Sequence, residues 1–470
     1  MGVARAIRWA AVLASLAGCV ELPWRSYSAA PPSPTRMPRP AASDAAAVPV
    51  SLPTLEDAHE YSLVELIDVA QRSNPETRQA WEQARAAAAR LGRAEAVYLP
   101  ALALTVIGGA RRQAFPSPDG EFSASGPYVD PRLELTWALL DLSRFAAVER
   151  ASALVREANF AFTRKHQEVM FGVARAFYGL DASRARLDAA QATLRSATVV
   201  EEAARARLDV GLATRPELLL AREARARAAY AVEAAAGAVR TSQGALAEAV
   251  GVSPSSPLRI TPLEAQPAPR DFGLSIEQIL EAVLRERPDL KALTADVRAR
   301  EADVRGARRS FAPRLSLTTS LGEQLWRFES DPPDKSFTLA EPEFDAQLKL
   351  DWELFTGFGR LNDVRAAEAE RGASAAALTA GALRALREAW TAYFDVQTAA
   401  RKVEFATALL ASAEEAYAAT LETYRRGLGT LIDVLTAERD LADARSTIIE
   451  SRAELLTAAA ALTFATGALR

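Results

Sequence analysis

The stretch Val210-Gly211-Leu212-Ala213-Thr214 returns 216 residues later as Arg426-Gly427-Leu428-Gly429-Thr430. On either side of this stretch, further landmarks recur in the same order at offsets between 213 and 216: Pro75 and Pro288, Pro100 and Pro313, Trp137 and Trp352, Gly251 and Gly467. An offset that drifts by only three residues indicates two copies of one structural unit, with insertions confined to loops. The sequence therefore predicts a duplicated domain, with units over residues 61–251 and 274–470 joined by a linker over residues 252–273.

Helices of unusual length dominate each unit. Residues 145–210 and 360–426 contain no proline and are rich in alanine, arginine, glutamate and leucine. At about 1.5 Å per residue, each of these helices would extend on the order of 100 Å. Shorter return helices are expected over residues 216–249 and 431–464. An opening helix and a return helix together match one long helix in length, so each unit should form a long hairpin beside two shorter segments.

The start of each unit carries a helix signal. Ser62 precedes Glu65 by three residues, and Ser275 precedes Gln278 by the same spacing, which is the pattern of a capping box. We expect both units to open with a helix, which Pro75 or Pro288 then breaks or kinks.

Four segments between the helices alternate apolar and polar residues with the period of a β-strand. Each is close to ten residues long, and about 9–11 residues is what a tilted strand needs to cross a bilayer. The Pro/Gly/Ser-rich stretches 111–127 and 327–342 are expected to be loops. The alternating apolar positions begin at Leu102, Leu133, Leu315 and Phe344.

Alternation alone does not place these strands in a membrane, because a soluble antiparallel sheet with one wet face alternates in the same way. In the last segment, Asp345, Lys349 and Asp351 would contact water while the opposite face contacts lipid. Four strands leave open edges, which cannot lie in hydrocarbon. A chain that enters the membrane through these strands must therefore oligomerise, and a cyclic trimer would supply twelve strands.

The N-terminal sequence predicts secretion. Arg5 and Arg8 precede a short apolar stretch that ends in Leu16-Ala17-Gly18-Cys19, so residues 1–18 resemble a signal peptide. Cys19 is the only cysteine of the chain and can form no internal disulfide. Its position resembles the lipoprotein box, which implies a covalent lipid on Cys19; the alternative is an ordinary signal with a chance cysteine. Residues 19–60 would then be the lipid anchor and a Pro/Ala-rich linker.

Composition and motifs argue against catalysis and nucleic-acid binding. The formal net charge is −4, and it becomes about −6 without residues 1–18, so no basic footprint for nucleic acid is present. His59 and His166 lie far apart in sequence without metal-ligand companions. No Gly-rich phosphate loop follows a strand. We expect no enzyme activity, no metal and no cofactor other than the lipid on Cys19.

The ordered, duplicated landmarks resemble those of the TolC-like outer-membrane efflux proteins: the Pro-acidic pairs Pro75-Glu76 and Pro288-Asp289, the strand-end Trp137 and Trp352, the two Gly-Leu-x-Thr turns, and the closing Gly251 and Gly467. The resemblance implies a mainly α fold with a β portion. It further implies a trimeric channel-tunnel, in which a 12-stranded outer-membrane β-barrel with four strands per chain continues into a long periplasmic α-helical barrel. The implied partners are two more copies of the chain, a periplasmic adaptor protein and an inner-membrane pump.

The same resemblance assigns a periplasmic gate to the two hairpin turns. It places Glu217, Tyr424 and Asp433 on gate positions. Where the family often has an arginine, this chain has Gly429, and Arg215 is the leading substitute, with Arg425 and Arg426 as further candidates.

The turns also have readings that follow from helix chemistry alone. Thr214 with Glu217 and Thr430 with Asp433 are expected to be capping boxes of the return helices. The hairpin tips at Gly211, Leu212, Gly427 and Leu428 are expected to dock the adaptor. For the two leucines, packing within the hairpin is an equally good interpretation.

These features predict the outer-membrane channel of a tripartite efflux system, which passively exports small molecules such as drugs or metal ions from the periplasm. One alternative is the outer-membrane channel of a type I protein secretion system, which differs in its partner. An alternative of another class is a periplasmic structural lipoprotein without a pore, which would have no need for four alternating strand segments.

Overall fold

The structure is a computed structural model that describes residue 53 and residues 59–117, 120–256, 258–262, 275–331 and 336–469. The chain divides into the unit Met1–Leu52 and the unit Pro53–Arg470. The predicted signal peptide, Cys19 and nearly all of the predicted linker that ends at residue 60 lie outside the described residues.

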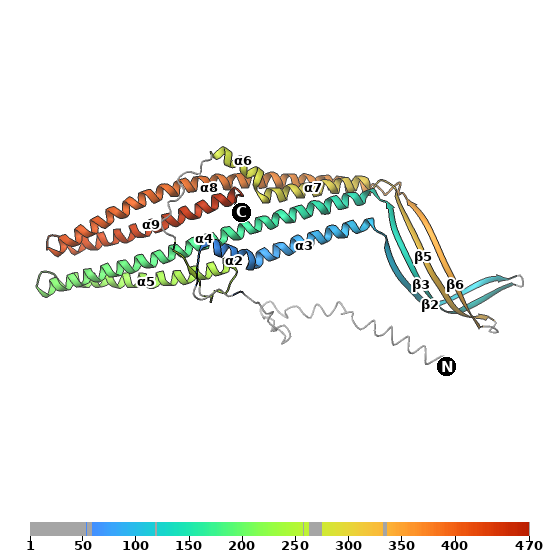
Figure 1. Ribbon diagram of the computed structural model, residues 1–470, viewed down its shortest axis with the longest axis horizontal. Coiled ribbons are helices and arrows are strands. Elements are labelled where there is room, and N and C mark those ends of the chain that lie inside the picture. The colour runs from blue at the N-terminus through green and yellow to red at the C-terminus, as the bar shows by residue number, and fades with distance from the viewer. Residues whose placement is uncertain are drawn as a thin grey trace. The chain divides into compact units, whose positions relative to one another are not determined.

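The second unit contains the duplication that the sequence predicts: two shorter helices, two strands, then a long helix and its return helix, twice over (Figure 1). The long helices have 68 and 67 residues, and the return helices have 36 and 35 residues, which confirms the expected hairpins. The helices of the first copy are α2 (Leu63–Ser73), α3 (Pro75–Glu95), α4 (Leu142–Asp209) and α5 (Arg215–Val250). Those of the second are α6 (Ile276–Glu286), α7 (Pro288–Arg309), α8 (Gly359–Arg425) and α9 (Leu431–Ala465).

The predicted capping boxes open both copies. Ser62 and Glu65 exchange hydrogen bonds at the start of α2, and Ser275 and Gln278 do so at the start of α6. Each opening helix then ends before its proline, because the residue that precedes a proline is forced into extended backbone. The ψ angle of that residue is 125° in both copies, and the proline becomes the first residue of α3 or α7.

The four long strands form one antiparallel sheet in the order β2-β3-β5-β6 (Figure 1). They span Ala101–Ser117, Gly120–Leu140, Arg314–Asp331 and Ser336–Asp351. A separate two-residue parallel pair joins β1 (Glu60–Tyr61) to β4 (Arg259–Ile260). In the second unit, β2 and β6 are the edges of the long sheet, each paired on one side only.

The strands have 16 to 21 residues, so the prediction of about ten residues each was wrong. Most of the stretches 111–127 and 327–342 is strand, whereas the sequence predicted loops. Prolines misled the prediction, because proline cannot donate to a sheet ladder. In β3, Pro127 and Pro131 lie where the strand makes no bridge to β5: the bridges are at Ser125 and Tyr128, and again at Val129 and Arg132.

Matching hydrogen bonds join the strands to the helices in both copies. The indole N–H of Trp137 donates to the carbonyl of Tyr98 at 3.0 Å, and that of Trp352 donates to the carbonyl of Phe311 at 3.1 Å. The recurrence of these tryptophans therefore marks the same junction, where the end of the second strand meets the end of the shorter helix.

The helical core is built largely from small side chains. α4 packs against α3, α5, α7 and α9, and α8 packs against α7 and α9. Alanines occupy many of the buried positions, among them Ala204, Ala221, Ala389 and Ala399. Small residues allow the helices to approach closely along their length. None of the helices in the described ranges combines the length and the apolar character that a membrane crossing requires.

Candidate functional site

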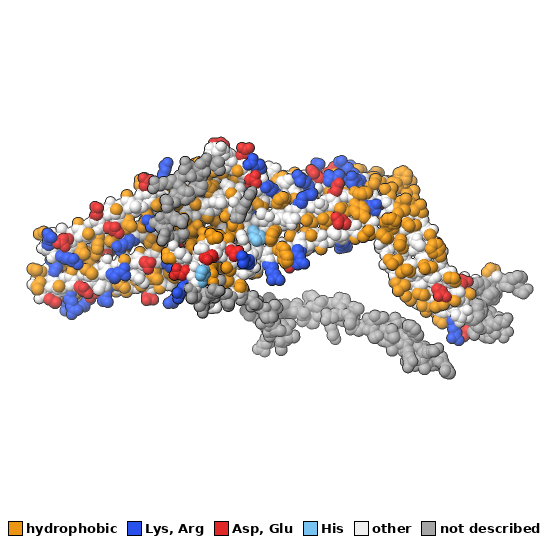
Figure 2. All heavy atoms as spheres, in the orientation of Figure 1, with side chains coloured by type: hydrophobic (Ala, Val, Ile, Leu, Met, Phe, Trp, Pro, Cys, Tyr) orange, Lys and Arg blue, Asp and Glu red, His pale blue; other side chains and the backbone are white. Residues whose placement is uncertain are grey.

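The two faces of the sheet differ in polarity over its central rows. One row across the four strands is Leu104, Leu133, Leu321 and Phe344, whose exposed fractions run from 40% to 70%. The next row, which points to the opposite face, is Thr105, Arg132, Gly322 and Glu343. Figure 2 shows the hydrophobic side chains gathered over these strands. An exposed apolar face backed by a polar face is the arrangement of a sheet between lipid and water.

The polar face carries an ion network that crosses three strands. Arg132 on β3 contacts Asp130 at 3.0 Å and reaches over β5 to Glu343 on β6 at 2.8 Å. Gly322 lies between them on β5, where a Cβ atom would stand 2.9 Å from the Pro131 carbonyl oxygen. The glycine is therefore required for the close approach of the arginine's strand.

The two hairpin turns have the same backbone. Gly211 and Gly427 adopt left-handed φ angles of 75° and 78°, which favour glycine at the end of a helix. The N–H groups of Leu212 and Leu428 donate back to carbonyls five residues earlier, at 2.7 and 2.9 Å. Both leucine side chains are exposed, by 68% and 80%, so they do not pack within the hairpin. Their role in docking a partner stays a prediction.

The return helices begin differently, although the sequence predicted capping boxes for both. At α9, Asp433 accepts from the Thr430 hydroxyl at 2.6 Å and the Thr430 N–H at 3.0 Å, and the box is complete. These hydrogen bonds lower the pKa of the Asp433 carboxyl. At α5 the prediction was wrong: Thr214 makes no cap, and its hydroxyl donates to Glu217 at 3.4 Å. Pro216 is the second residue of that helix and lacks one of the N–H groups that a capping side chain uses.

Tyr424 lies at the end of α8, with 1% of its surface exposed. It packs in a cluster with Val200, Ala204, Ala221, Leu431 and Val434, which come from α4, α5 and α9. Burial raises the pKa of the Tyr424 hydroxyl, the charge of Arg207 opposes this shift, and the charge of Glu217 adds to it. The structure therefore brings Tyr424 and Glu217 within electrostatic range. The Tyr424 hydroxyl makes no hydrogen bond within the described ranges.

The arginine beside Tyr424 is Arg207, which the sequence analysis did not single out. Its guanidinium lies 4.6 Å from the centre of the Tyr424 ring and donates to the Tyr424 carbonyl. By contrast, Arg215 is exposed at the start of α5, and Arg426 pairs with Glu422 on its own helix. The sequence contains one signal that could have identified Arg207. The equivalent position in the second copy is Thr423, so the first copy has a positive charge where the second copy has a neutral residue.

A second overlooked group is Glu438 on α9. It is 6% exposed, and burial raises the pKa of its carboxyl to about 7. Its Oε1 atom has no hydrogen-bond partner within the described chain.

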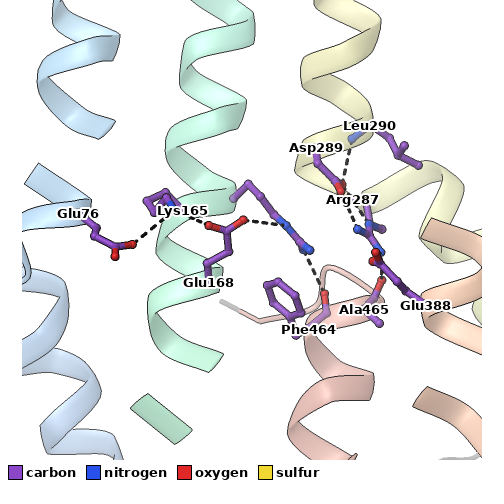
Figure 3. Close-up of polar contacts among 10 residues, drawn as sticks. Glu76, Lys165, Glu168, Arg287, Asp289, Leu290, Glu388, Phe464 and Ala465 are labelled. Atoms are coloured by element: carbon purple, nitrogen blue, oxygen red, sulfur yellow. Dashed lines mark hydrogen bonds and ion pairs between the residues drawn. The ribbon is translucent and has the colours of Figure 1, made fainter. Parts of the chain in front are cut away.

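Charged residues also join the two copies midway along the helices (Figure 3). Arg287 is 3% exposed and contacts Asp289 at 2.6 Å and Glu388 at 2.9 Å. Burial opposes ionisation of Asp289, but the hydrogen bonds and charge of Arg287 prevail and lower the pKa of this carboxyl. From the first copy, Arg164 lies 3.7 Å from the ring centre of Phe464 on α9. This network ties the end of α9 to α4.

The histidines have ordinary neighbours. His59 lies 3.3 Å from Glu65, and His166 makes an edge contact with Phe162 at 4.5 Å between ring centres. The described parts of the chain contain no group of three or more His, Cys, Asp or Glu residues that could hold a metal ion.

Comparison with known proteins identifies the architecture. A family model described as outer membrane efflux protein matches residues 66–252 and 279–468. Protein CyaE of Bordetella pertussis (strain Tohama I) is 30% identical over 323 residues, which are 68% of this chain. The chain spans 65% of the length of that relative.

Solved structures share the fold at low identity. The outer-membrane channel OprN superposes with a TM-score of 0.73 at 20% identity, covering 88% of this chain and 93% of OprN. VceC of Vibrio cholerae gives 0.72 at 20% identity, over 86% and 96% of the two chains. CusC gives 0.71 at 20% identity, over 86% and 92%. The chain belongs to the outer membrane efflux protein family.

Proposed function

We propose that this chain is the outer-membrane channel of a tripartite efflux system and passively conducts small molecules from the periplasm to the exterior. The observation that carries the proposal is the four-stranded sheet. One face is apolar and exposed, the opposite face is polar and charged, and the edges β2 and β6 are unpaired in a single chain.

The unpaired edges favour assembly with further copies. Open sheet edges cannot lie in hydrocarbon, and single-chain barrels begin at about eight strands. Three copies would join β6 of one chain to β2 of the next and close a sheet of twelve strands. The apolar face would then contact lipid and the polar face would line the pore, while the long helices continue the channel on the periplasmic side.

The hairpin tips are the proposed entrance. Glu217, Tyr424 and Asp433 lie at the ends of the helices that meet there, which supports the proposed gate. The exposed Leu212 and Leu428 are proposed to contact a periplasmic adaptor, which would couple the channel to an inner-membrane pump. Cys19 is proposed to carry a lipid, and a mass of the mature protein without an added acyl group would contradict this assignment.

The test is single-channel conductance of the purified full-length protein in a planar bilayer. The expected result is small, cation-favouring steps, because Glu217 and Asp433 repeated three times would form an acidic ring. Silence from protein shown by protease protection to be inserted would refute the channel. That outcome would favour a periplasmic structural lipoprotein instead.

A further inference from the structure

Arg207 connects the two hairpins of one chain at their tips. Its side chain leaves α4 within the last turn of that helix. One terminal nitrogen donates to the carbonyl of Tyr424 at the end of α8, and the other donates to the carbonyl of Leu212 in the α4–α5 turn at 3.2 Å. The guanidinium also lies over the Tyr424 ring. A single cation therefore holds backbone from both hairpins and the buried tyrosine between them.

The Tyr424 carbonyl lies at the end of α8, where the carbonyls form the negative end of the helix dipole. It also accepts from the Gly427 N–H at 2.9 Å, so Arg207 is its second donor, and the Leu212 carbonyl belongs to the turn that follows α4. Arg207 is half-buried and supplies positive charge at the C-terminal ends of two helices at once. Because the planar guanidinium presents its donors in a fixed fork, it can serve two carbonyls that lie on different segments.

The connection is present once per chain. The repeat offset of 216 places Thr423 at the position equivalent to Arg207, and Leu208 at the position equivalent to Tyr424. The end of α8 therefore has no arginine at the equivalent position that could donate to the α4–α5 turn of a neighbouring chain. The contact between hairpins of the same chain is chemically distinct from any contact that a second copy of the chain makes.

We propose that Arg207 is a positioning residue of the entrance, which latches the α4–α5 tip to the end of α8 and thereby holds the closed arrangement around Tyr424. This inference rests on the proposed channel function. Opening the entrance requires the hairpin tips to separate, and separation leaves both carbonyls and the guanidinium without these contacts. Removing the latch should therefore shift the equilibrium toward open states.

The experiment compares the full-length protein with Arg207→Ala, Arg207→Lys and the control Arg205→Ala in planar bilayers. Arg205 is an exposed arginine on the same turn of α4. For Arg207→Ala we expect an open probability raised by about tenfold, since a hydrogen bond to a charged group is typically worth that factor or more. Lysine keeps the charge but not the fork, so Arg207→Lys should recover part of the wild-type behaviour. Arg205→Ala should behave as wild type.

The readouts separate a latch from a merely structural arginine. A latch predicts altered gating with rescue by lysine and an unfolding temperature close to that of the wild type. Wild-type gating in Arg207→Ala overturns the latch, and so does a gating change that Arg207→Lys shares in full. A wild-type protein that is inserted and silent overturns the proposed function itself, which distinguishes that failure from the failure of the latch.

Discussion

We predict that Glu438→Gln removes a pH-dependent decrease in the free energy of unfolding. The decrease arises because Glu438, which is buried where α9 packs against α4, ionises as the pH rises. The carboxyl lies between the core residues Val434 and Leu441, which are 0% and 3% exposed. The Tyr417 hydroxyl on α8 faces this region. It hydrogen-bonds with Ser196 on α4, and the charges of Glu438, Arg425 and Arg445 act on it. Glu438 therefore belongs to a small polar layer inside an apolar interface, and its Oε1 atom has no hydrogen-bond partner in the part of the chain that the structure describes.

The magnitude follows from the pKa. Burial raises the pKa of Glu438 from 4.5 to about 7. Each pH unit of difference between folded and unfolded states is worth about 1.4 kcal/mol, so ionisation of this carboxyl in the folded chain costs about 3 kcal/mol. Below about pH 4.5 the carboxyl is protonated in both states and the penalty is absent. The penalty grows as the pH rises to about 7 and is constant above that, so stability falls with rising pH.

The assay is denaturant-induced unfolding of the detergent-extracted protein, followed by tryptophan fluorescence at several pH values. Glutamine stays neutral and similar in shape. The free-energy difference between Glu438→Gln and wild type should therefore increase by about 3 kcal/mol between about pH 4.5 and about pH 8. Glu415→Gln changes an exposed glutamate on α8 and serves as the control, for which no comparable increase is expected. Parallel curves for Glu438→Gln and wild type would refute the reasoning.

The other predictions concern the gate, a helix junction and a buried arginine. Glu217→Ala combined with Asp433→Ala should enlarge the single-channel steps; unchanged steps at normal expression would remove both residues from the gate. Gly251→Ala should lower the unfolding free energy by about 1–3 kcal/mol, because its φ is +86° and a Cβ there would lie 2.9 Å from a backbone carbon of the α3 cap. The same change at Gly237, inside α5 with nothing within 4 Å of a Cβ, should raise stability by about 0.5–1 kcal/mol. Arg287→Met should cost about 1–3 kcal/mol in the same unfolding measurement, because Asp289 and Glu388, both partly exposed, lose their hydrogen bonds to a buried cation.

Much of the fold could be predicted because its signals are local. A capping box needs two residues three apart, and both opening helices obey it at Ser62 and Ser275. The left-handed turns need a glycine, and Gly211 and Gly427 supply it. Strand length was not predictable in this way. Pro127 is tolerated inside β3 because the strand makes no bridge to β5 at that position. The bridges depend on how β5 pairs with β3, which the sequence around Pro127 does not reveal.

The candidate site was less predictable, because its contacts join residues far apart in sequence. Tyr424, Glu217 and Asp433 lie at helix ends that the repeat locates, and the structure places them at the tips. Arg207 contacts a carbonyl 217 residues away, and no spacing rule reports such a contact. Nor does periodicity identify Glu438, since a polar residue on an alanine-rich helix is ordinarily read as solvent-facing.

The two copies share the residues that join the strands to the helices within each copy. The shared landmarks contact their own copy: Trp137 bonds Tyr98, and Trp352 bonds Phe311. These tryptophans have equivalent neighbours in both copies, and the same residue type is present in both.

A residue between the copies has different neighbours in each, and there the sequences diverge. Arg164 of the first copy donates to the carbonyl of Phe464 in the second copy at 3.4 Å, whereas the position equivalent to Arg164 is Ala380. Arg207 and Thr423 diverge in the same way at the tips. The backbone plan is thus repeated, while Arg164 and Arg207, which contact the second copy, have the uncharged equivalents Ala380 and Thr423.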